Sequence, residues 1–577
     1  MKKWLQFAQQ PELKQQFASE LKLSPLLAQV LLNRGISTLK QAQGFLNPQL
    51  AELCDPFEIP NIDQAAKRVL QARASGEKVL VYGDYDVDGV TGTAIMLHSL
   101  KFLGISAEYY IPHRYDEGYS LSQASVKKIA AKGVKLVITV DCGTASLREI
   151  EQAKALGLDV IVTDHHNLPV KLPAAYAVVN PKLIAGEHPS KNLSGAGVAF
   201  KFAWALLRVA GEKDSVFLTS LLDLAALGTI SDVVPLTAEN RVLAVRGLKL
   251  LNERKRLGLK HLAEVSSIKG NLSVNHVYFA LAPRINAAGR LEHATKSLEL
   301  MLTEDEAQAR ALALELNKIN VRRRGIGGDI KEEVFSRLDD SYISENQLIL
   351  LSGENWHPGV IGIVASQLVD RFVRPAILVG VNEGIGRGSA RSISGFNVFN
   401  LLNSCQDLFI DFGGHAGAAG FEIKADNIAA LFSRLKEAGA ASLSAEALSP
   451  KIMIDAKLAP SEITMSLIRE LEILDPHGEG NPTPIFMSQG LKLSDLRRVG
   501  NNGQHLKLKM TDGQSNLETI GFNLGDLADQ LTYNIGYDVA YHLEANEWNG
   551  FETAQLRLVD IREAAINESK TNERMGE

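Results

Sequence analysis

The sequence predicts an α/β protein in which two α/β domains are followed by a small β-barrel. From residue 78, short runs of β-branched and aliphatic residues alternate with helical patterns, which is typical of βαβ units around a buried parallel sheet. A second, shorter set of strand and helix patterns begins near residue 347. After residue 450, short alternating runs separated by Asn-Gly and Asp-Gly turns indicate a β-barrel.

Composition excludes several classes of protein. The 61 basic and 67 acidic residues give a net charge of −6, and 45% of the 577 residues are hydrophobic, which excludes both disorder and a wholesale basic coat. A local basic groove remains compatible with this balance. The three cysteines form no CxxC pair, so neither a zinc knuckle nor a disulfide framework is indicated. No apolar run is long enough to cross a membrane, and we expect a cytoplasmic protein.

The patterns divide the chain into five parts. An N-terminal helical cap is expected over 1–50, a first α/β domain over 51–302 and a connecting helix over 303–340. A second α/β domain is expected over 341–440 and the barrel over 451–565.

Three glycines interrupt the pattern of the connecting helix. Gly325, Gly327 and Gly328 each cost about 1 kcal/mol inside a helix. The sequence therefore predicts a kink or break there, and a flexible hinge between the two α/β domains.

Acidic residues and histidines follow three predicted strands of the first domain, Val79–Tyr82, Leu136–Val140 and Val160–Thr163. Because ligands of open α/β sheets lie outside the carboxyl ends of the strands, these groups should converge. So many carboxylates in one crevice repel one another unless cations neutralise them, which indicates divalent metals. The residues are Asp84, Asp86, Asp88, Asp141, Asp164, His165 and His166.

Two other interpretations of these acids are weaker. An EF-hand loop starting at Asp84 would need Glu at its twelfth position, which is Ile95, and the run follows a strand where an EF-hand needs a helix. Turn or helix-cap roles could explain any one cluster but not three at matching strand ends. A mixed nitrogen and oxygen site suits Mn²⁺ or Mg²⁺, and two such ions predict a phosphoester or phosphoanhydride hydrolase.

Asp164-His165-His166 is the motif that gives the DHH phosphoesterases their name. Over nearly the whole chain, the order of motifs resembles that of the bacterial single-strand-specific exonucleases of the RecJ family. The resemblance implies a DHH catalytic domain, a connecting helix, a DHHA1 substrate-binding domain and an OB-fold barrel. The motifs are Gly83–Gly89, Val140–Gly143, Gly228–Leu236, Ala282–Leu291, Trp356–Ala365 and Gly413–Gly420.

The resemblance also implies two Mn²⁺ or Mg²⁺ ions and a role for each residue around them. Asp86 and Asp88 would hold one metal each, and Asp141 would bridge the two. His165 and Asp232 would complete the second site, and the choice of Asp232 comes from the resemblance alone.

Two further residues take less central places in the implied site. Asp84 would be an additional ligand or would stand just behind the ligands, and His166 would face the scissile phosphate.

A DNA path is implied by further matching positions. Arginine binds two phosphate oxygens through its planar fork, an aromatic ring stacks on a base, and glycine-rich backbone approaches phosphate closely. Ser120 stands where the family usually has glycine. The substrate-binding positions are Arg114, Tyr119, Arg284, Asn286, Arg290, Ser389, Arg391 and His415.

The predicted barrel carries a basic cluster. Lys507 and Lys509 share one face of a strand and could follow a phosphate backbone, although a solvated charged edge is the competing interpretation. The cluster consists of Lys492, Arg497, Arg498, His505, Lys507 and Lys509.

The implied function is a metal-dependent 5′→3′ exonuclease that hydrolyses single-stranded DNA to 5′-mononucleotides in DNA repair and recombination. A helicase and a single-stranded-DNA-binding protein would be its partners. One alternative is a DHH phosphodiesterase acting on short oligonucleotides or cyclic dinucleotides, which needs no OB-fold. The other is a non-catalytic nucleic-acid-binding scaffold, in which loss of the metal carboxylates would be expected.

Overall fold

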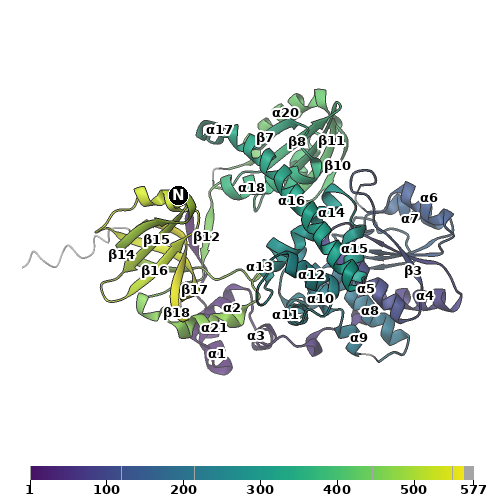
Figure 1. The fold of residues 1–577 in the computed structure, drawn as a ribbon, viewed down its shortest axis with the longest axis horizontal. Helices are drawn as coiled ribbons and strands as arrows, with labels where there is room; N and C mark the ends of the chain where they lie inside the picture. The colour runs from purple at the N-terminus through teal and green to yellow at the C-terminus, as the bar shows by residue number, and fades with distance from the viewer. Residues whose placement is uncertain (1, 119, 214, 445, 549, 565–577) are drawn as a thin grey trace, which may run out of the picture. The chain divides into compact units, whose positions relative to one another are not determined.

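The computed structural model describes residues 2–118, 120–213, 215–444, 446–548 and 550–564 (Figure 1). The chain forms two compact units, one made of Met1–Pro48 with Lys451–Glu577 and the other of Gln49–Pro450. Within the described ranges, no helix combines the length and the apolar character needed to cross a bilayer.

The first domain of the larger unit is built on a parallel five-stranded sheet, as predicted. Its strand order is β3-β2-β4-β5-β6, so the three strands that precede the acidic motifs are direct neighbours. One face packs on α5 (Val87–Phe102) and α8 (Gly195–Val209), the other on α6 (Gln123–Ala131) and α7 (Leu147–Ala155). The strands are β2 (Val79–Gly83), β3 (Ala107–Tyr110), β4 (Leu136–Val140), β5 (Asp159–Thr163) and β6 (Ala177–Val179).

Helices complete this domain, and all but one of those named below lie between residues 195 and 302. A π-helical turn, η5 (Val277–Leu281), leads into α14. Pro283 has no N–H to donate to Phe279, which accounts for the widened turn. The remaining helices are α4 (Ile62–Ala74), α9 (Ser215–Thr219), α10 (Leu222–Ser231), α11 (Ala238–Asn252), α12 (Leu257–Val265), α13 (Val274–His276), α14 (Ala282–Leu291) and α15 (Thr295–Leu302).

The connecting helix, α16 (Glu306–Ser336), is one uninterrupted helix drawn in teal between the two α/β domains (Figure 1). The predicted break at its glycines is therefore wrong. Ile326, Ile330 and Val334 recur every four residues and pack together with α18 (Pro358–Phe372). Burial of this stripe outweighs the helix propensity lost at the glycines.

The second domain contains strands and helices, as predicted from the patterns that begin near residue 347. Its five-stranded sheet has the order β10-β11-β9-β8-β7, in which only the β7–β8 pair is parallel. Helix α18 packs against β8 and β9. The other elements are α17 (Asp340–Glu345), β7 (Ile349–Glu354), β8 (Ala376–Asn382), β9 (Ile385–Arg391), α19 (Val398–Asn403), β10 (Phe409–Gly414), β11 (Ala418–Lys424) and α20 (Ile428–Ser442).

The smaller unit contains the predicted barrel, which closes on itself. Antiparallel pairs join β14 to β15, β15 to β16, β17 to β18 and β14 to β17, and a short parallel pair joins β16 to β18. Closure leaves these strands without a free edge. The elements are β12 (Lys451–Ile454), β13 (Ala456–Lys457), α21 (Met465–Leu471), β14 (Phe486–Val499), β15 (His505–Thr511), β16 (Asn516–Gly521), β17 (Gly536–Trp548) and β18 (Phe551–Glu563).

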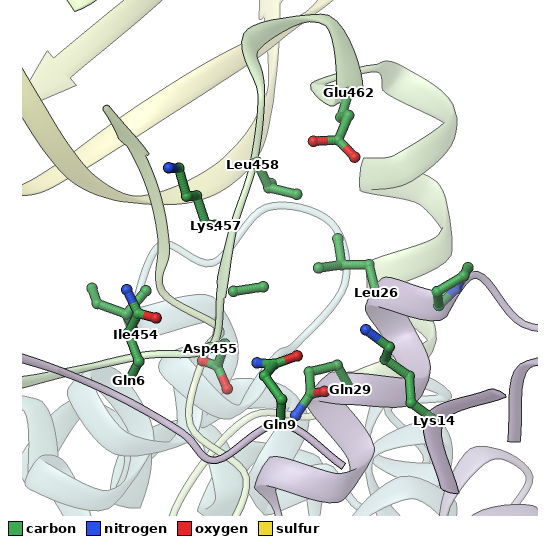
Figure 2. Close-up of a pocket in the computed structure, with 12 residues that line it drawn as sticks. Gln6, Gln9, Lys14, Leu26, Gln29, Ile454, Asp455, Lys457, Leu458 and Glu462 are labelled. Atoms are coloured by element: carbon green, nitrogen blue, oxygen red, sulfur yellow. The ribbon is translucent and has the colours of Figure 1, made fainter. Parts of the chain in front are cut away.

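The N-terminal segment belongs to this barrel unit. Strand β1 (Lys3–Gln6) pairs in parallel with β12, and the helices share a hydrophobic core with the barrel strands. A polar pocket of about 360 Å³ lies where they meet (Figure 2), and at its edge Asp455 pairs with Arg34 at 2.7 Å. None of the site residues predicted from sequence lines this pocket. The helices are α1 (Pro11–Leu21), α2 (Pro25–Asn33) and α3 (Leu39–Leu46).

Candidate metal centre and substrate cleft

The first acidic motif forms the turn between β2 and α5. Asp86 is the N-cap of α5, since its Oδ1 accepts the N–H of Gly89 at 3.1 Å. The alternative considered from the sequence, that these acids are helix caps, is therefore correct for Asp86, which caps α5 as well as joining the cluster. Asp84 and Asp88 flank it, and both are buried. The turn therefore brings three carboxylates to the carboxyl end of the central strands.

The buried Asp88 is held by the N-terminus of α8. Its two carboxylate oxygens accept the N–H groups of Gly195 at 2.5 Å and Ala196 at 2.9 Å. A Cβ on Gly195 would lie 2.6 Å from Asp141, so only glycine allows this approach. This contact was not predicted from the sequence. Ser194, a favoured N-cap residue, is the local signal of a helix N-terminus there, and such a terminus binds carboxylates.

Asp141 follows β4 in a strained conformation. Its φ is +62°, in the left-handed region that costs a non-glycine residue roughly 1 to 2 kcal/mol. Its N–H donates to the carbonyl of Thr163 at 3.0 Å, which ties the turn to the neighbouring strand. The fold thus fixes a buried carboxylate between two strand ends despite the backbone strain.

Asp164 anchors the two histidines that follow it. Its Oδ1 accepts the backbone N–H groups of His165 and His166 and lies 2.7 Å from His166 Nδ1. Its Oδ2 accepts the N–H of Thr144 at 2.9 Å. Burial raises the pKa of Asp164, but the hydrogen bond with His166 and the histidine charges outweigh it and lower the pKa. The carboxylate therefore orients the histidines.

The pKa values of the two histidines are shifted in opposite directions. Burial lowers the pKa of His166, but the hydrogen bond and the charge of Asp164 outweigh this effect, so its pKa is raised. His165 has its pKa lowered to about 3 by burial and by the charge of His166. A neutral imidazole is the form that binds a metal.

His165 lies at the centre of the acidic cluster. Its Nε2 is 3.1 Å from Asp141 Oδ1, 3.5 Å from Asp232 Oδ2 and 3.9 Å from Asp88 Oδ2. Asp232 is the residue that ends α10. The structure thus brings Asp232, chosen from the family resemblance, to the residues chosen from the strand ends.

Possible ligand atoms of these residues gather in three overlapping groups, each within 4.8 Å. One consists of Asp84, Asp86 and Asp141, and another of Asp88, His165 and Asp232; the third joins Asp141 to both histidines. Each of these groups could hold a metal ion.

The electrostatics of the cluster suit cations. Burial, followed by the neighbouring carboxylates, raises the pKa of Asp88 to about 7 and that of Asp232 to about 9. The same causes raise the pKa of Asp84 and Asp141 well above the ordinary value. Among the residues that the structure describes, none forms a hydrogen bond with the buried Asp84 Oδ1 or His165 Nε2. Divalent ions would neutralise the repulsion and use these atoms, so the residues present fit them.

Three predicted arginines from the two α/β domains lie near one another, and the charge of one of them, Arg114, acts on Asp84 of the cluster. Burial and the charge of Arg114 lower the pKa of Arg290 to about 10, and the same causes lower the pKa of Arg391. Among the described residues, no ion pair joins these three arginines to a carboxylate. Buried cations that lack an acidic partner favour an anionic ligand.

The second domain contributes three predicted residues, of which His415 lies beside His166 and the other two, Ser389 and Arg391, lie on β9. Arg391 Nη1 donates to Ser389 Oγ at 3.0 Å, and the ring of His415 stacks on that of His166 with centroids 6.2 Å apart. Arg290 of the first domain donates to the carbonyl of Gly359 at 3.2 Å. The two α/β domains therefore meet at the site.

Two predicted substrate-binding residues already make structural contacts. Arg284 donates through Nε to Asn317 at 2.9 Å and through Nη1 to the carbonyl of Ala280 at 2.7 Å. Asn286 Oδ1 accepts the N–H of Val87, between two of the metal-site aspartates, at 3.1 Å. Both residues thus position neighbouring segments.

Two remaining loop predictions have different outcomes. Tyr119 lies outside the described residues. Ser120 has a φ of +68°, the left-handed conformation for which glycine is favoured, and its carbonyl accepts the hydroxyl of Tyr82 at 2.9 Å. The replacement of glycine by serine therefore leaves the glycine-like backbone in place.

The basic cluster of the barrel is partly neutralised. Lys507 and Lys509 do share one strand face, and both lie near Glu518, at 3.7 and 3.3 Å. Arg498 pairs with Asp529 at 2.5 Å. These pairs reduce the positive charge available on this face.

Comparisons with known proteins agree with the domain order. The family model of the DHH family, N-terminal domain, matches residues 78–229, the DHHA1 domain 345–440 and the RecJ OB domain 454–560. The single-stranded-DNA-specific exonuclease RecJ of Bacillus subtilis is 41% identical over 95% of this chain and 69% of its own length. The Haemophilus influenzae protein of that name is 36% identical over 93% of this chain and 96% of its own. The chain belongs to the RecJ family.

A solved structure of a RecJ protein has the same fold. The Thermus thermophilus RecJ in complex with Mn²⁺ is 33% identical, has a TM-score of 0.85 and covers 97% of this chain and 79% of its own. A second structure of that protein contains Mg²⁺. The predicted fold, a DHH domain joined by a long helix to a DHHA1 domain and followed by an OB barrel, is confirmed.

Proposed function

We propose that this protein is a metal-dependent exonuclease that hydrolyses single-stranded DNA in the 5′→3′ direction and releases 5′-mononucleotides. The observation that carries this proposal is the set of three overlapping ligand groups around Asp141 and His165. They lie at the carboxyl end of a parallel sheet, in a chain whose relatives are named as single-stranded-DNA-specific exonucleases.

The chain would hold two Mn²⁺ or Mg²⁺ ions in this cluster. We assign Asp86 to the first and Asp88 to the second, with Asp141 between them. His165 and Asp232 complete the second site, which agrees with their grouping with Asp88. When bound, two such ions lower the pKa of a water molecule and stabilise negative charge at phosphorus.

Two residues are assigned beside the ions. Asp84, which groups with Asp86 and Asp141, is a further ligand of the first site or supports it. His166, oriented by Asp164, faces the scissile phosphate, where its raised pKa favours a protonated ring that donates to a phosphate oxygen.

The arginines would bind the strand itself. Arg290 and Arg391 are buried cations next to the cluster, and Arg114 lies close enough to lower the pKa of each. With Ser389 and His415 they supply hydrogen-bond donors to backbone phosphates, because arginine binds phosphate oxygens through its planar fork. Tyr119 is assigned to base stacking from the family resemblance.

The meeting of two domains over the cluster supports a preference for a single strand. His166 of the first domain stacks on His415 of the second, and Tyr115 donates to the carbonyl of Arg290, whose side chain reaches Gly359. A site covered in this way favours one flexible strand over a rigid duplex. The OB barrel would add further contacts to the strand.

We also propose the biological setting. A helicase would supply unwound ends and a single-stranded-DNA-binding protein would present them, in DNA repair and recombination. This work would take place in the cytoplasm.

The proposal is tested with single-stranded and duplex DNA of equal sequence, labelled at either end. The protein and its Asp141→Ala variant are incubated with Mn²⁺, Mg²⁺ or chelator. Mononucleotides released from the 5′ end of the single strand alone, and lost with chelator or the substitution, are the expected result.

Other outcomes would favour the alternatives. Tight binding of intact DNA with either metal would favour a non-catalytic scaffold. Hydrolysis of a short oligonucleotide or a cyclic dinucleotide, with long DNA neither bound nor cut, would favour a phosphodiesterase of small substrates.

A further inference from the structure

A further group of three possible metal ligands contains none of the residues of the catalytic cluster. Cys54, Glu58 and His188 each offer one ligand atom, and these atoms lie within 4.8 Å of one another. Nε2 of His188 is 2.9 Å from Oε2 of Glu58, although the two residues are 130 positions apart in the chain. The fold therefore assembles a thiol, an imidazole and a carboxylate that no short motif of the sequence joins.

The backbone of Cys54 is anchored independently of its thiol. Its N–H donates to Glu239 Oε1 at 2.7 Å, and its carbonyl accepts Lys201 Nζ at 2.6 Å. Lys201 and Glu239 are themselves buried and pair at 2.7 Å. Cys54 is thus fixed in place without the use of its sulfur, and it is the one cysteine of the three that is partly exposed.

Backbone N–H groups orient the other two side chains. The N–H of Asp55 donates to Glu58 Oε1 at 3.1 Å, which leaves Oε2 to face His188. The N–H of Ser190 donates to His188 Nδ1 at 3.2 Å, which leaves Nε2 to face Glu58. A metal bond at Nε2 needs the ring proton at Nδ1, so the contact with Ser190 would be exchanged for it. The side chain of His188 is 15% exposed and that of Glu58 is 50% exposed, which gives an ion access from solvent.

The three donor types together select a thiophilic ion. Zn²⁺ binds cysteine thiolate, histidine nitrogen and carboxylate oxygen at about 2.0 to 2.3 Å, so its ligand atoms lie about 3 to 4 Å from one another. The three ligand atoms are close enough for small side-chain rotations to reach that spacing. A thiolate favours Zn²⁺ over Mn²⁺ and Mg²⁺, which suit the oxygen-rich catalytic cluster.

The electrostatic surroundings of the thiol are compatible with a cation. Burial, followed by the charge of Glu239, raises the pKa of Cys54, and the charge of Glu58 adds to this effect. The charge of Lys201 acts in the opposite direction but does not outweigh them. The thiol is therefore protonated at neutral pH, and a divalent ion that binds the thiolate would release this proton to solvent.

We propose that Cys54, Glu58 and His188 bind one Zn²⁺ ion as thiolate, carboxylate and neutral imidazole, with water as the fourth ligand. The proposal is independent of the exonuclease function, because none of the three residues belongs to the catalytic cluster or to the predicted substrate-binding positions. It gives the chain two kinds of metal site with different preferences.

The ion would join two segments that are far apart in the sequence and would support the catalytic domain. Glu58 belongs to η2 (Pro56–Glu58), and His188 caps η4 (Pro189–Asn192), the turn that leads into α8. The first N–H groups of α8 hold Asp88 of the catalytic cluster. Because metal links that close long loops of chain stabilise a fold most, Zn²⁺ bound here should raise the melting temperature.

The test uses Co²⁺ as a spectroscopic probe of the full chain. A thiolate bound to Co²⁺ gives a charge-transfer band in the near ultraviolet, which oxygen and nitrogen ligands do not give. The ligand groups of the catalytic cluster contain no cysteine, so the band reports on Cys54. The reduced protein is titrated with Co²⁺ and then with Zn²⁺, in excess Mg²⁺. We expect a saturable band that Zn²⁺ abolishes, because Zn²⁺ binds such sites more tightly than Co²⁺ does.

Matched variants assign the band to the proposed ligands. Cys54→Ser should lose it, and His188→Ala should weaken the affinity for Co²⁺ at least tenfold. Cys405→Ser, which changes a buried cysteine of the second domain, is the control and should keep both the band and the affinity. The rise in melting temperature with Zn²⁺ should be smaller in Cys54→Ser than in Cys405→Ser by about 3 °C or more.

Three results would overturn this inference. They are the absence of the band in the unmodified protein, a band that persists in Cys54→Ser, and equal effects of Zn²⁺ on the melting temperatures of Cys54→Ser and Cys405→Ser. If Cys54→Ser does not fold, His188→Ala decides, because an unchanged affinity for Co²⁺ in that variant would show that the imidazole is not a ligand.

Discussion

The Nδ1 atom of His166 lies 2.7 Å from Oδ1 of Asp164, and the same oxygen accepts the backbone N–H groups of His165 and His166. The other oxygen of Asp164 accepts the N–H of Thr144. The carboxylate that opens the DHH motif thus accepts hydrogen bonds within the protein through both of its oxygens. It orients the histidines, and the role that we propose for it in the reaction is exerted through them.

Asp164→Ala should reduce the rate of single-stranded DNA hydrolysis between about 10-fold and 100-fold, the usual loss when the partner of a metal-site histidine is removed. The matched control is Asp159→Ala at the other end of β5, where the carboxylate pairs with Arg68 at 2.7 Å. Initial rates with Mn²⁺ measure the effect, and melting temperatures show whether each variant is folded. Full activity of Asp164→Ala would refute the positioning role, as would an equal loss in Asp159→Ala.

The convergence of the acidic residues and histidines was largely predictable because most of them follow strands. Runs of buried β-branched residues identify β2, β4 and β5, and parallel strands place Asp84, Asp141 and Asp164 at one edge of the sheet. Asp232 was not predictable in this way, because it ends a helix and no local pattern links that helix to the sheet. Only the family resemblance pointed to it.

Long-range packing set the limit of the fold prediction. The N-terminal helices were expected from their amphipathic pattern. Their packing against the barrel could not be predicted, because the barrel follows more than 400 residues later and no local pattern links the two segments. Strand β1 has four residues and exists through its pairing with β12. The glycines of α16 predicted a break from propensity alone, and tertiary packing overrode that preference.

The continuous α16 predicts that replacing its exposed glycines stabilises the protein. Apart from the backbone of α16 itself, no described residue has a heavy atom within 4 Å of a Cβ built at Gly325 or Gly328, so alanine gains helix propensity without a clash. Each substitution should raise the free energy of unfolding by about 1 kcal/mol, measured from urea denaturation. Gly327→Ala is the control, because its Cβ would lie 3.2 Å from Val360 Cγ1 and should gain less. A loss of stability in Gly325→Ala or Gly328→Ala would mean that the helix needs a flexible point there.

We expect the free energy of unfolding to fall below neutral pH because of His98, whose pKa is lowered in the folded protein. Burial, and then the charge of Arg256 at 3.1 Å, lower the pKa of His98 to about 4, whereas an unfolded histidine titrates near 6.5. The unfolded chain therefore binds the proton first, and stability that is complete above pH 6.5 declines as the pH falls toward 4. The loss should reach about 3 kcal/mol at most, by urea denaturation across this range. His98→Gln should flatten the profile between these pH values, and a profile unchanged by this substitution would assign the titration to other groups.

We expect a single methyl group added at Gly228 of α10 to reduce activity. A Cβ there would lie 2.5 Å from Thr91 Oγ1 and 2.6 Å from Asp88 Oδ1, so Gly228→Ala must move the helix or the metal-site carboxylate. We expect a destabilisation of about 1 to 3 kcal/mol, which is typical of an overpacked core, together with a fall of at least tenfold in kcat. Gly247→Ala is the control. Gly247 lies on α11, and its Cβ would overlap Leu222 and Ala226 of α10, away from Asp88. It should be destabilised while the folded enzyme keeps its kcat, and equal kcat values for the two variants would show that Gly228 matters for packing alone.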